Sequence, residues 1–193
     1  MQGVREYIIK IEQAFKDEIK LKSGLELKVV SKLDQPKYSN RIGEVISTPA
    51  RGDNHIEKGS KVLIDPTVLF KQIYRGQYQE SMFLVDKEKG YYRVEPNMVI
   101  MYQKDNTWYC NNHNVLIEPI YTEVDFNSGI YLNPIKKLKK NYGKIAYINK
   151  KLLEEGLKVG DEVIHVSNRE FEFEFEGNIY FQMRDVDVLA KVI

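Results

Sequence analysis

Hydrophobic and polar residues alternate over short stretches of this chain, and no long stretch has the spacing of an amphipathic helix. In the clearest stretch, Phe171, Phe173 and Phe175 alternate with glutamates, which predicts a strand whose phenylalanines face a core or a subunit interface. Gly177-Asn178 then predicts a turn into the next strand. Other strands are predicted at residues 7–11, 41–47, 61–64, 91–94, 98–102, 115–120 and 179–183, with a helical turn or a loop at 150–156. The pattern predicts an all-β protein.

One short motif occurs twice: a glycine is followed by an aliphatic residue, a variable residue and a second aliphatic residue. The two copies are Ser23-Gly24-Leu25-Glu26-Leu27 and Ser128-Gly129-Ile130-Tyr131-Leu132. Three further segments match in the same order: 40–46 with 141–147, 56–64 with 157–164, and 92–101 with 181–190. Because all four matches keep one order at an offset of roughly a hundred residues, we interpret the chain as two copies of one module. The predicted boundaries are 1–104 for the first module, 105–114 for a polar linker and 115–193 for the second module. Residues 67–90 of the first module suggest an added hairpin or flap.

The two tripeptides that follow these glycines, Leu25-Glu26-Leu27 and Ile130-Tyr131-Leu132, lie in long polar segments, at residues 13–40 and 121–142. Connections of that length are uncommon inside a compact domain unless they have a function or are disordered, so we expect one or the other for these segments. The second segment also contains Lys136-Lys137-Leu138-Lys139-Lys140. We interpret these lysines as a solvated flank of the loop, while contact with nucleic acid or an acidic surface stays open.

Composition excludes several classes of protein. A hydrophobic content of 42% with 30% charged residues is typical of a globular protein with a core. The 29 Lys and Arg against 28 Asp and Glu give no long-range attraction for nucleic acid or an anionic membrane. With Cys110 as the single cysteine, no internal disulfide forms, which suits a reducing compartment. The chain has neither a signal-peptide pattern nor an apolar run long enough to span a membrane, so we expect a cytoplasmic protein.

The sequence offers no pattern for catalysis. His55, His113 and His165 are far apart in sequence and have no cysteine partners, so no metal site is predicted. There is no nucleophile elbow, P-loop or dinucleotide-binding glycine motif. We therefore expect a protein that is not an enzyme and needs no cofactor.

At this point the motifs resemble a known family, the GroES-type co-chaperonins or chaperonin-10 family. In the second module the resemblance covers the strand at 115–120, the element Gly129-Ile130-Tyr131-Leu132, and the segments at 143–149, 157–166 and 185–193. The first module follows the same plan more weakly, at 41–47 and 56–64. The pair is similar to the tandem co-chaperonins of plastids, and its divergent loops suggest a phage-encoded or otherwise unusual version. The resemblance implies two tandem GroES-like small β-barrels with long mobile loops.

The resemblance also implies a function. Members cap an ATP-dependent GroEL-type chaperonin and enclose an unfolded substrate protein, without chemistry of their own. The implied chaperonin-binding residues are Gly24, Leu25, Leu27, Gly129, Ile130, Tyr131 and Leu132. The implied contacts between subunits of a homo-oligomeric ring involve Tyr7, Ile9, Ile11, Val115, Ile117, Val188, Leu189 and Val192. The expected location is the cytoplasm of a bacterium or of an infected host cell.

Two other functions stay open from the sequence. A structural or assembly protein, for example of a virus, would reuse the barrel without a chaperonin partner and keep its loops packed. A nucleic-acid-binding barrel would act through the lysine cluster and bind less tightly as salt rises.

Overall fold

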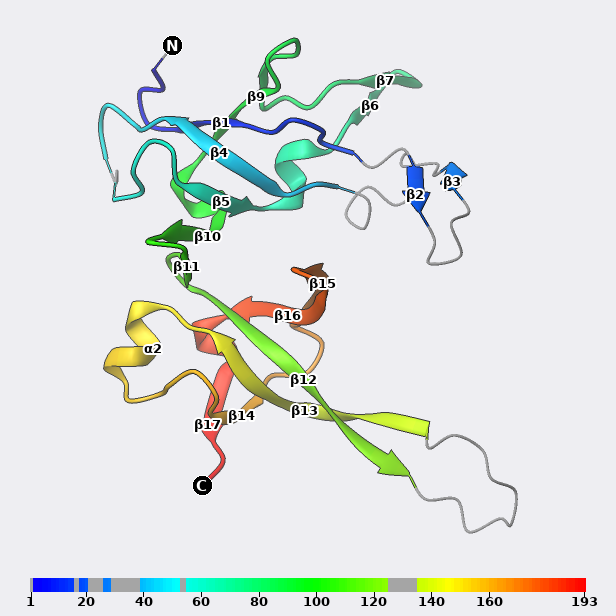
Figure 1. The fold of residues 1–193 in the computed structure, drawn as a ribbon, viewed down its shortest axis with the longest axis vertical. Helices are drawn as coiled ribbons and strands as arrows, with labels where there is room; N and C mark the ends of the chain where they lie inside the picture. The colour runs from blue at the N-terminus through cyan, green and yellow to red at the C-terminus, as the bar shows by residue number, and fades with distance from the viewer. Residues whose placement is uncertain (1, 16–17, 21–25, 29–38, 53–54, 125–134) are drawn as a thin grey trace. The chain divides into compact units, whose positions relative to one another are not determined.

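The computed structural model describes residues 2–15, 18–20, 26–28, 39–52, 55–124 and 135–193. It divides into two compact units, Met1–Trp108 and Tyr109–Ile193. Each unit is built on one antiparallel sheet (Figure 1). Within the described part of the chain, no helix is long and apolar enough to cross a membrane.

The sheet of the first unit has seven strands in the order β11-β10-β5-β4-β1-β9-β8. These are β1 (Tyr7–Lys10), β4 (Ile42–Ser47), β5 (Lys61–Ile64), β8 (Leu84–Asp86), β9 (Tyr91–Val94), β10 (Val99–Lys104) and β11 (Thr107–Cys110). Two hairpins lie outside this sheet: β2 (Glu18–Lys20) with β3 (Glu26–Lys28), and β6 (Gln72–Tyr74) with β7 (Gln77–Gln79). Short 3-10 helices, η1 (Pro66–Leu69) and η2 (Pro96–Met98), precede β6 and β10.

The sheet of the second unit has six strands in the order β15-β16-β12-β13-β14-β17. These are β12 (Asn114–Val124), β13 (Ile135–Tyr147), β14 (Glu162–His165), β15 (Phe171–Phe175), β16 (Asn178–Arg184) and β17 (Val188–Lys191). The 3-10 helix η3 (Asp185–Asp187) precedes β17. The segment after β13 forms a short helix, α2 (Lys150–Glu154), because Asn149 caps it: its Oδ1 accepts a hydrogen bond from Leu152 N at 2.9 Å.

The two sheets share one strand order. Taken from the closing strand, β17-β14-β13-β12-β16-β15 in the second unit corresponds to β10-β5-β4-β1-β9-β8 in the first. Backbone hydrogen bonds at equivalent places support this correspondence. Gly59 N donates to Val45 O in the first unit, and Gly160 N donates to Ile145 O in the second, both at 2.8 Å. Likewise, Asp65 N donates to Met98 O at 2.8 Å in the first unit, and Val166 N donates to Asp187 O at 2.9 Å in the second. The prediction of an all-β chain is confirmed, and each of the two compact units is built on one antiparallel sheet.

One detail of the sequence match is wrong by one residue. The match of 40–46 with 141–147 pairs Gly43 with Lys144. In the structure Gly43 lies opposite Val62 and Gly143 lies opposite the equivalent Val163. The two glycines are therefore equivalent, whereas the sequence match aligns Asn40, which precedes β4, with Asn141, which lies inside β13.

Each sheet buries the apolar face of its central strands. In the first unit Ile9, Val45 and Val62 are fully buried, and in the second the equivalent Ile117, Ile145 and Val163 are buried to the same degree. Burying one such side chain completely is worth about 1.5–3 kcal/mol, so these positions are the main source of each unit's stability.

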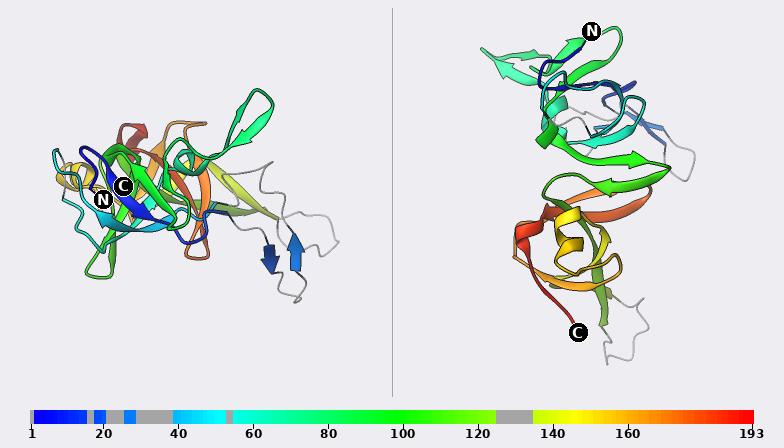
Figure 2. Two further views of the ribbon diagram at one scale, coloured as in Figure 1. Left: turned by 90° about the horizontal axis from the view of Figure 1, so that it is seen from above. Right: turned by 90° about the vertical axis from the view of Figure 1, so that its left-hand side faces the viewer.

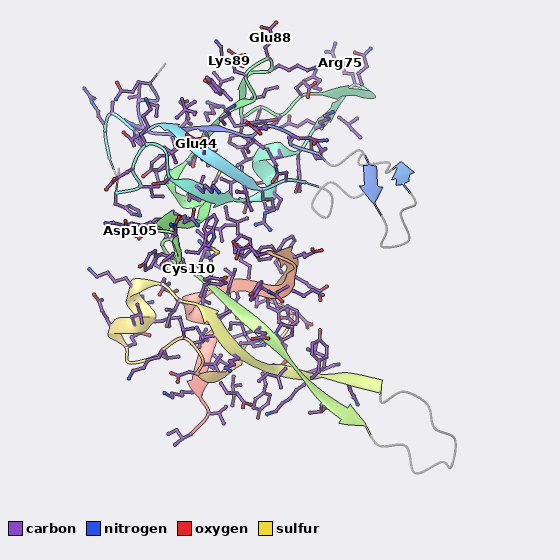
Figure 3. All side chains as sticks on the ribbon, in the orientation of Figure 1. Glu44, Arg75, Glu88, Lys89, Asp105 and Cys110 are labelled. Atoms are coloured by element: carbon purple, nitrogen blue, oxygen red, sulfur yellow. The ribbon has the colours of Figure 1, made fainter. Side chains whose placement is uncertain are left out.

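The extra residues of the first unit lie between β5 and β8. They form η1, which Asp65 caps by accepting a hydrogen bond from Thr67 N at 2.9 Å, and then the β6–β7 hairpin (Figure 2). Arg75 and Gly76 form the tip of this hairpin, with φ angles of 49° and 76° (Figure 3). Two consecutive positive φ angles are typical of the tight turn that matches the twist of a β-hairpin.

Candidate functional site

Most of the predicted chaperonin-binding residues lie outside the described residues: Gly24, Leu25, Gly129, Ile130, Tyr131 and Leu132. Leu27 lies on β3, opposite Ile19 of β2. The structure instead shows how the chain leads into and out of both tripeptide segments.

In the second unit the approach is a two-stranded ribbon. The outer parts of β12 and β13 pair with each other beyond the sheet, and the last pair is Val124 with Ile135 (Figure 1). Residues 121–124 and 135–142 were predicted as loop, and this part of the prediction is wrong. Their polar side chains suggested a loop, whereas the pairing depends on contacts between segments distant in sequence. Residues 125–134, which include the tripeptide, connect the two ends of this ribbon.

In the first unit the first tripeptide segment is inserted at the equivalent place, between β1 and β4. β1 and β4 correspond to β12 and β13, and their pairing continues through Asn40 N to Ala14 O at 2.9 Å. An isolated bridge between Phe15 and Ser39 follows. Both tripeptides are therefore inserted between the same two strands of their modules.

The lysine run lies within β13, on the ribbon that β12 and β13 form in the second unit. Lys139 Nζ is 2.7 Å from Glu162 Oε1 and 3.9 Å from the centre of the Tyr142 ring. Lys137 and Lys140 are exposed. The run is thus part of an ordered strand rather than a loop flank, and one of its charges is neutralised inside the unit.

The predicted subunit-contact residues divide into two groups. The side chains of Tyr7, Ile9, Ile11, Val115 and Ile117 are at most 2% exposed and belong to the cores of their own units. Strands β1 and β12 also have a neighbouring strand on both sides. In contrast, Leu189 is 62% exposed and Val192 37% exposed, and Val188 is partly buried. β17, which carries Val188 and Leu189, is an edge strand.

A buried carboxylate that the sequence did not reveal lies beside the start of β12. Asp185 Oδ2 is 3.0 Å from His113 Nδ1 and 3.4 Å from Lys151 Nζ, and it accepts a hydrogen bond from Asn149 Nδ2 at 3.3 Å. Burial raises the pKa of the Asp185 carboxyl, but the hydrogen bonds and charges of His113 and Lys151 outweigh burial and lower the pKa below its ordinary value.

This cluster attaches the preceding segment to the second unit. Asn149 Nδ2 donates to Asn112 O at 2.9 Å, and Asp185 N donates to His113 O at 2.8 Å. Residues 112 and 113, which fall in the predicted linker, are therefore fixed to the second unit. The equivalent positions in the first unit are Arg5, Pro49 and Pro96, which cannot form the same network.

Two other side chains that could react or bind a metal, Cys110 and His165, are packed inside the fold. Among the residues that the structure describes, no group of three or more His, Cys, Asp or Glu could hold a metal ion. Cys110 is buried, and burial raises the pKa of its thiol well above the ordinary range (Figure 3). A thiol that stays protonated is a poor nucleophile. The His165 ring is 2% exposed and lies edge-on to Phe181, with 6.4 Å between ring centroids.

A comparison with protein families identifies what the second unit is similar to. The model of the family described as the chaperonin 10 Kd subunit matches residues 110–192. This range covers the six-stranded sheet of the second unit and the segment between its two ribbon strands. The match supports a co-chaperonin role, and that family is not enzymatic.

Proposed function

We propose that this chain is a tandem co-chaperonin that works in the cytoplasm as part of a ring and caps an ATP-dependent chaperonin of the GroEL type. The observation that carries this proposal is the family match over residues 110–192, joined to the strand order that the first unit shares with the second. The family match does not favour the alternative of an assembly protein without a chaperonin partner.

The binding elements in this proposal are the two tripeptides. Leu25 and Leu27 of the first segment, and Ile130 and Leu132 of the second, insert into apolar grooves of the chaperonin. One buried aliphatic side chain gains about 1.5–3 kcal/mol, while each residue ordered on binding costs roughly 1–2 kcal/mol. A single loop therefore binds weakly. A ring that presents many loops gains affinity because each later contact is intramolecular, which can add a factor of roughly a hundred or more.

Assembly of the ring is supported by a difference between the two closing strands. Ile100 of β10 and Leu189 of β17 occupy equivalent positions, yet Ile100 is 1% exposed and Leu189 is 62% exposed. β10 has β11 on its outer edge, whereas β17 has no further strand beside it in the described chain. An apolar edge strand accepts another strand readily, so we assign β17 to the contact with the next chain of the ring.

A pull-down with a bacterial double-ring chaperonin, with ATP, with ADP and without nucleotide, tests the function. We expect retention that depends on nucleotide and that the double variant Ile130→Ser, Leu132→Ser abolishes. The matched control is Leu153→Ser with Val159→Ser, which changes two aliphatic side chains that are 49% and 61% exposed and lie away from the ribbon. Equal retention of wild type and the loop variant would refute the assignment of the loop. Absence of binding under every nucleotide condition would favour the assembly-protein alternative.

A further inference from the structure

Two lysines beside the second tripeptide segment have unneutralised charges. Lys137 and Lys140 are exposed on β13, and neither has an acidic partner among the residues that the structure describes. Lys139, which lies between them in sequence, is held by Glu162 at 2.7 Å. We call Lys137 and Lys140 the basic stalk.

Neither lysine of the basic stalk lies opposite an acidic residue in the strand register. Thr122 lies opposite Lys137, and its hydroxyl donates to Lys137 O at 3.2 Å, so it contributes no charge. Lys140 lies where the pairing of the two strands is irregular, between Pro119 and Tyr121 of β12. Lys136 differs, since Glu123 lies opposite it in the strand register, and it is not included in the stalk.

Covalent geometry keeps the basic stalk close to the tripeptide. Lys137 is the fifth residue after Leu132, so their Cα atoms are at most roughly 18 Å apart in any conformation. Charges at a surface act over about 8–10 Å at physiological salt, and a lysine side chain extends several ångströms towards them. A groove that holds Ile130 and Leu132 therefore brings its rim within reach of Lys137.

On the basis of the proposed function, we propose that the basic stalk contacts an acidic surface of the chaperonin, formed by Asp or Glu side chains beside the groove that receives the tripeptide. Such contacts at the rim of an interface accelerate association and select the correct partner. They also require no change in the apolar contacts. A protein surface is favoured over nucleic acid because the chain's net charge is +1 and two lysines neutralise few phosphates.

The test measures affinity for the same chaperonin, with ADP, from about 50 to about 300 mM salt. The stalk variant combines Lys137→Glu and Lys140→Glu, and a second variant replaces both residues by Arg. The control combines Lys58→Glu and Lys158→Glu, which makes the same change in net charge at exposed lysines that are not part of the ribbon strands. Thermal unfolding of each variant reports whether the fold is intact.

We expect the stalk variant to bind at least about tenfold more weakly at low salt, because every chain of the ring carries the reversal. The difference should shrink as salt rises, while the arginine variant and the control bind like wild type.

An equal loss of affinity in the stalk variant and the control would overturn the inference, because net charge alone would explain it. Unchanged binding of the stalk variant would overturn it as well while leaving the proposed function intact. Absence of wild-type binding would overturn both, and oligonucleotide binding that the stalk variant loses would assign these lysines to nucleic acid.

Discussion

Gly143 lies so close to Ile117 that a Cβ atom on Gly143 would be 2.1 Å from Ile117 Cγ2. The equivalent pair in the first unit has the same relationship, since a Cβ on Gly43 would be 2.5 Å from Ile9 Cγ2. In both units the isoleucine is a fully buried core residue, and the glycine is on the strand beside it. Each glycine thus lets two central strands approach with a large aliphatic side chain at the contact.

We expect Gly143→Ala to lower the free energy of unfolding by about 1–3 kcal/mol, the usual effect of overpacking a core. Urea unfolding of the full chain measures this change in the free energy of unfolding, and Gly43→Ala should cause a similar decrease. The cause is tested with the double variant Gly143→Ala, Ile117→Ala. If the clash is responsible, the double variant loses less stability than the sum of the single variants, by roughly 0.5–3 kcal/mol. Additive losses would show that the glycine matters for another reason.

His165 is a second position where comparison of the units suggests a substitution. Its ring is buried, and Nε2 has no hydrogen-bond partner among the residues that the structure describes, while the equivalent residue in the first unit is Ile64. An unsatisfied buried polar atom costs about 1–3 kcal/mol, part of which the bond between Nδ1 and Val166 O at 3.1 Å offsets. We expect His165→Ile to raise the free energy of unfolding by about 1 kcal/mol. A clear loss of stability in urea unfolding would mean that Nε2 has a role in the folded unit.

Asp185 should make stability depend on pH. Its pKa is lowered in the folded chain from the ordinary 3.8, because hydrogen bonds from His113 and Lys151 outweigh burial. A carboxyl with a depressed pKa adds stability above the pKa of the unfolded chain, and that stability is lost as pH falls through the lower folded value. The loss therefore occurs below about pH 4.

The variant Asp185→Asn tests this expectation. At neutral pH it should lower the free energy of unfolding by about 1–3 kcal/mol, since a buried charged acceptor is lost. The difference from wild type should narrow as pH falls below about 4. Glu154→Gln is the control, because Glu154 pairs with Lys150 at the surface, where ion pairs contribute little. A difference that stays constant from neutral to acid pH would exclude the carboxylate charge as the cause.

The alternation of Phe171, Phe173 and Phe175 predicts the strand β15, and the structure confirms it. The alternation does not predict how deeply each ring lies. Phe171 is 41% exposed, Phe173 is partly buried and Phe175 is 2% exposed, so burial increases along the strand. A period of two assigns side chains to a face of the sheet, whereas depth depends on where the neighbouring strands end.

The sequence predicted the candidate site less well than it predicted the fold. Polar composition led to a linker at 105–114 and to a loop at 121–142. The structure shows asparagines that form specific bonds, such as Asn114 Nδ2 donating to Asn111 O at 3.0 Å, and lysines on a paired strand. Composition gives the polarity of a segment but not its distant partners. Asp185 was missed for the same reason, because its partners His113, Asn149 and Lys151 lie 34–72 residues away in sequence.

The exposed edge of β17 gives a prediction about assembly. Leu189 is 62% exposed on a strand with no outer neighbour in the described chain, so replacing it by glutamate should not disturb a core. If β17 pairs with the next chain, Leu189→Glu buries a charge in that contact and opposes association strongly. We therefore expect wild type to sediment as an oligomer and Leu189→Glu to sediment as a smaller species with an unchanged unfolding temperature. Val159→Glu, at a residue 61% exposed away from this edge, should leave the oligomer intact. An oligomer of the same size in wild type and Leu189→Glu would place the contact between chains elsewhere, and the exposed β17 edge would then need another partner.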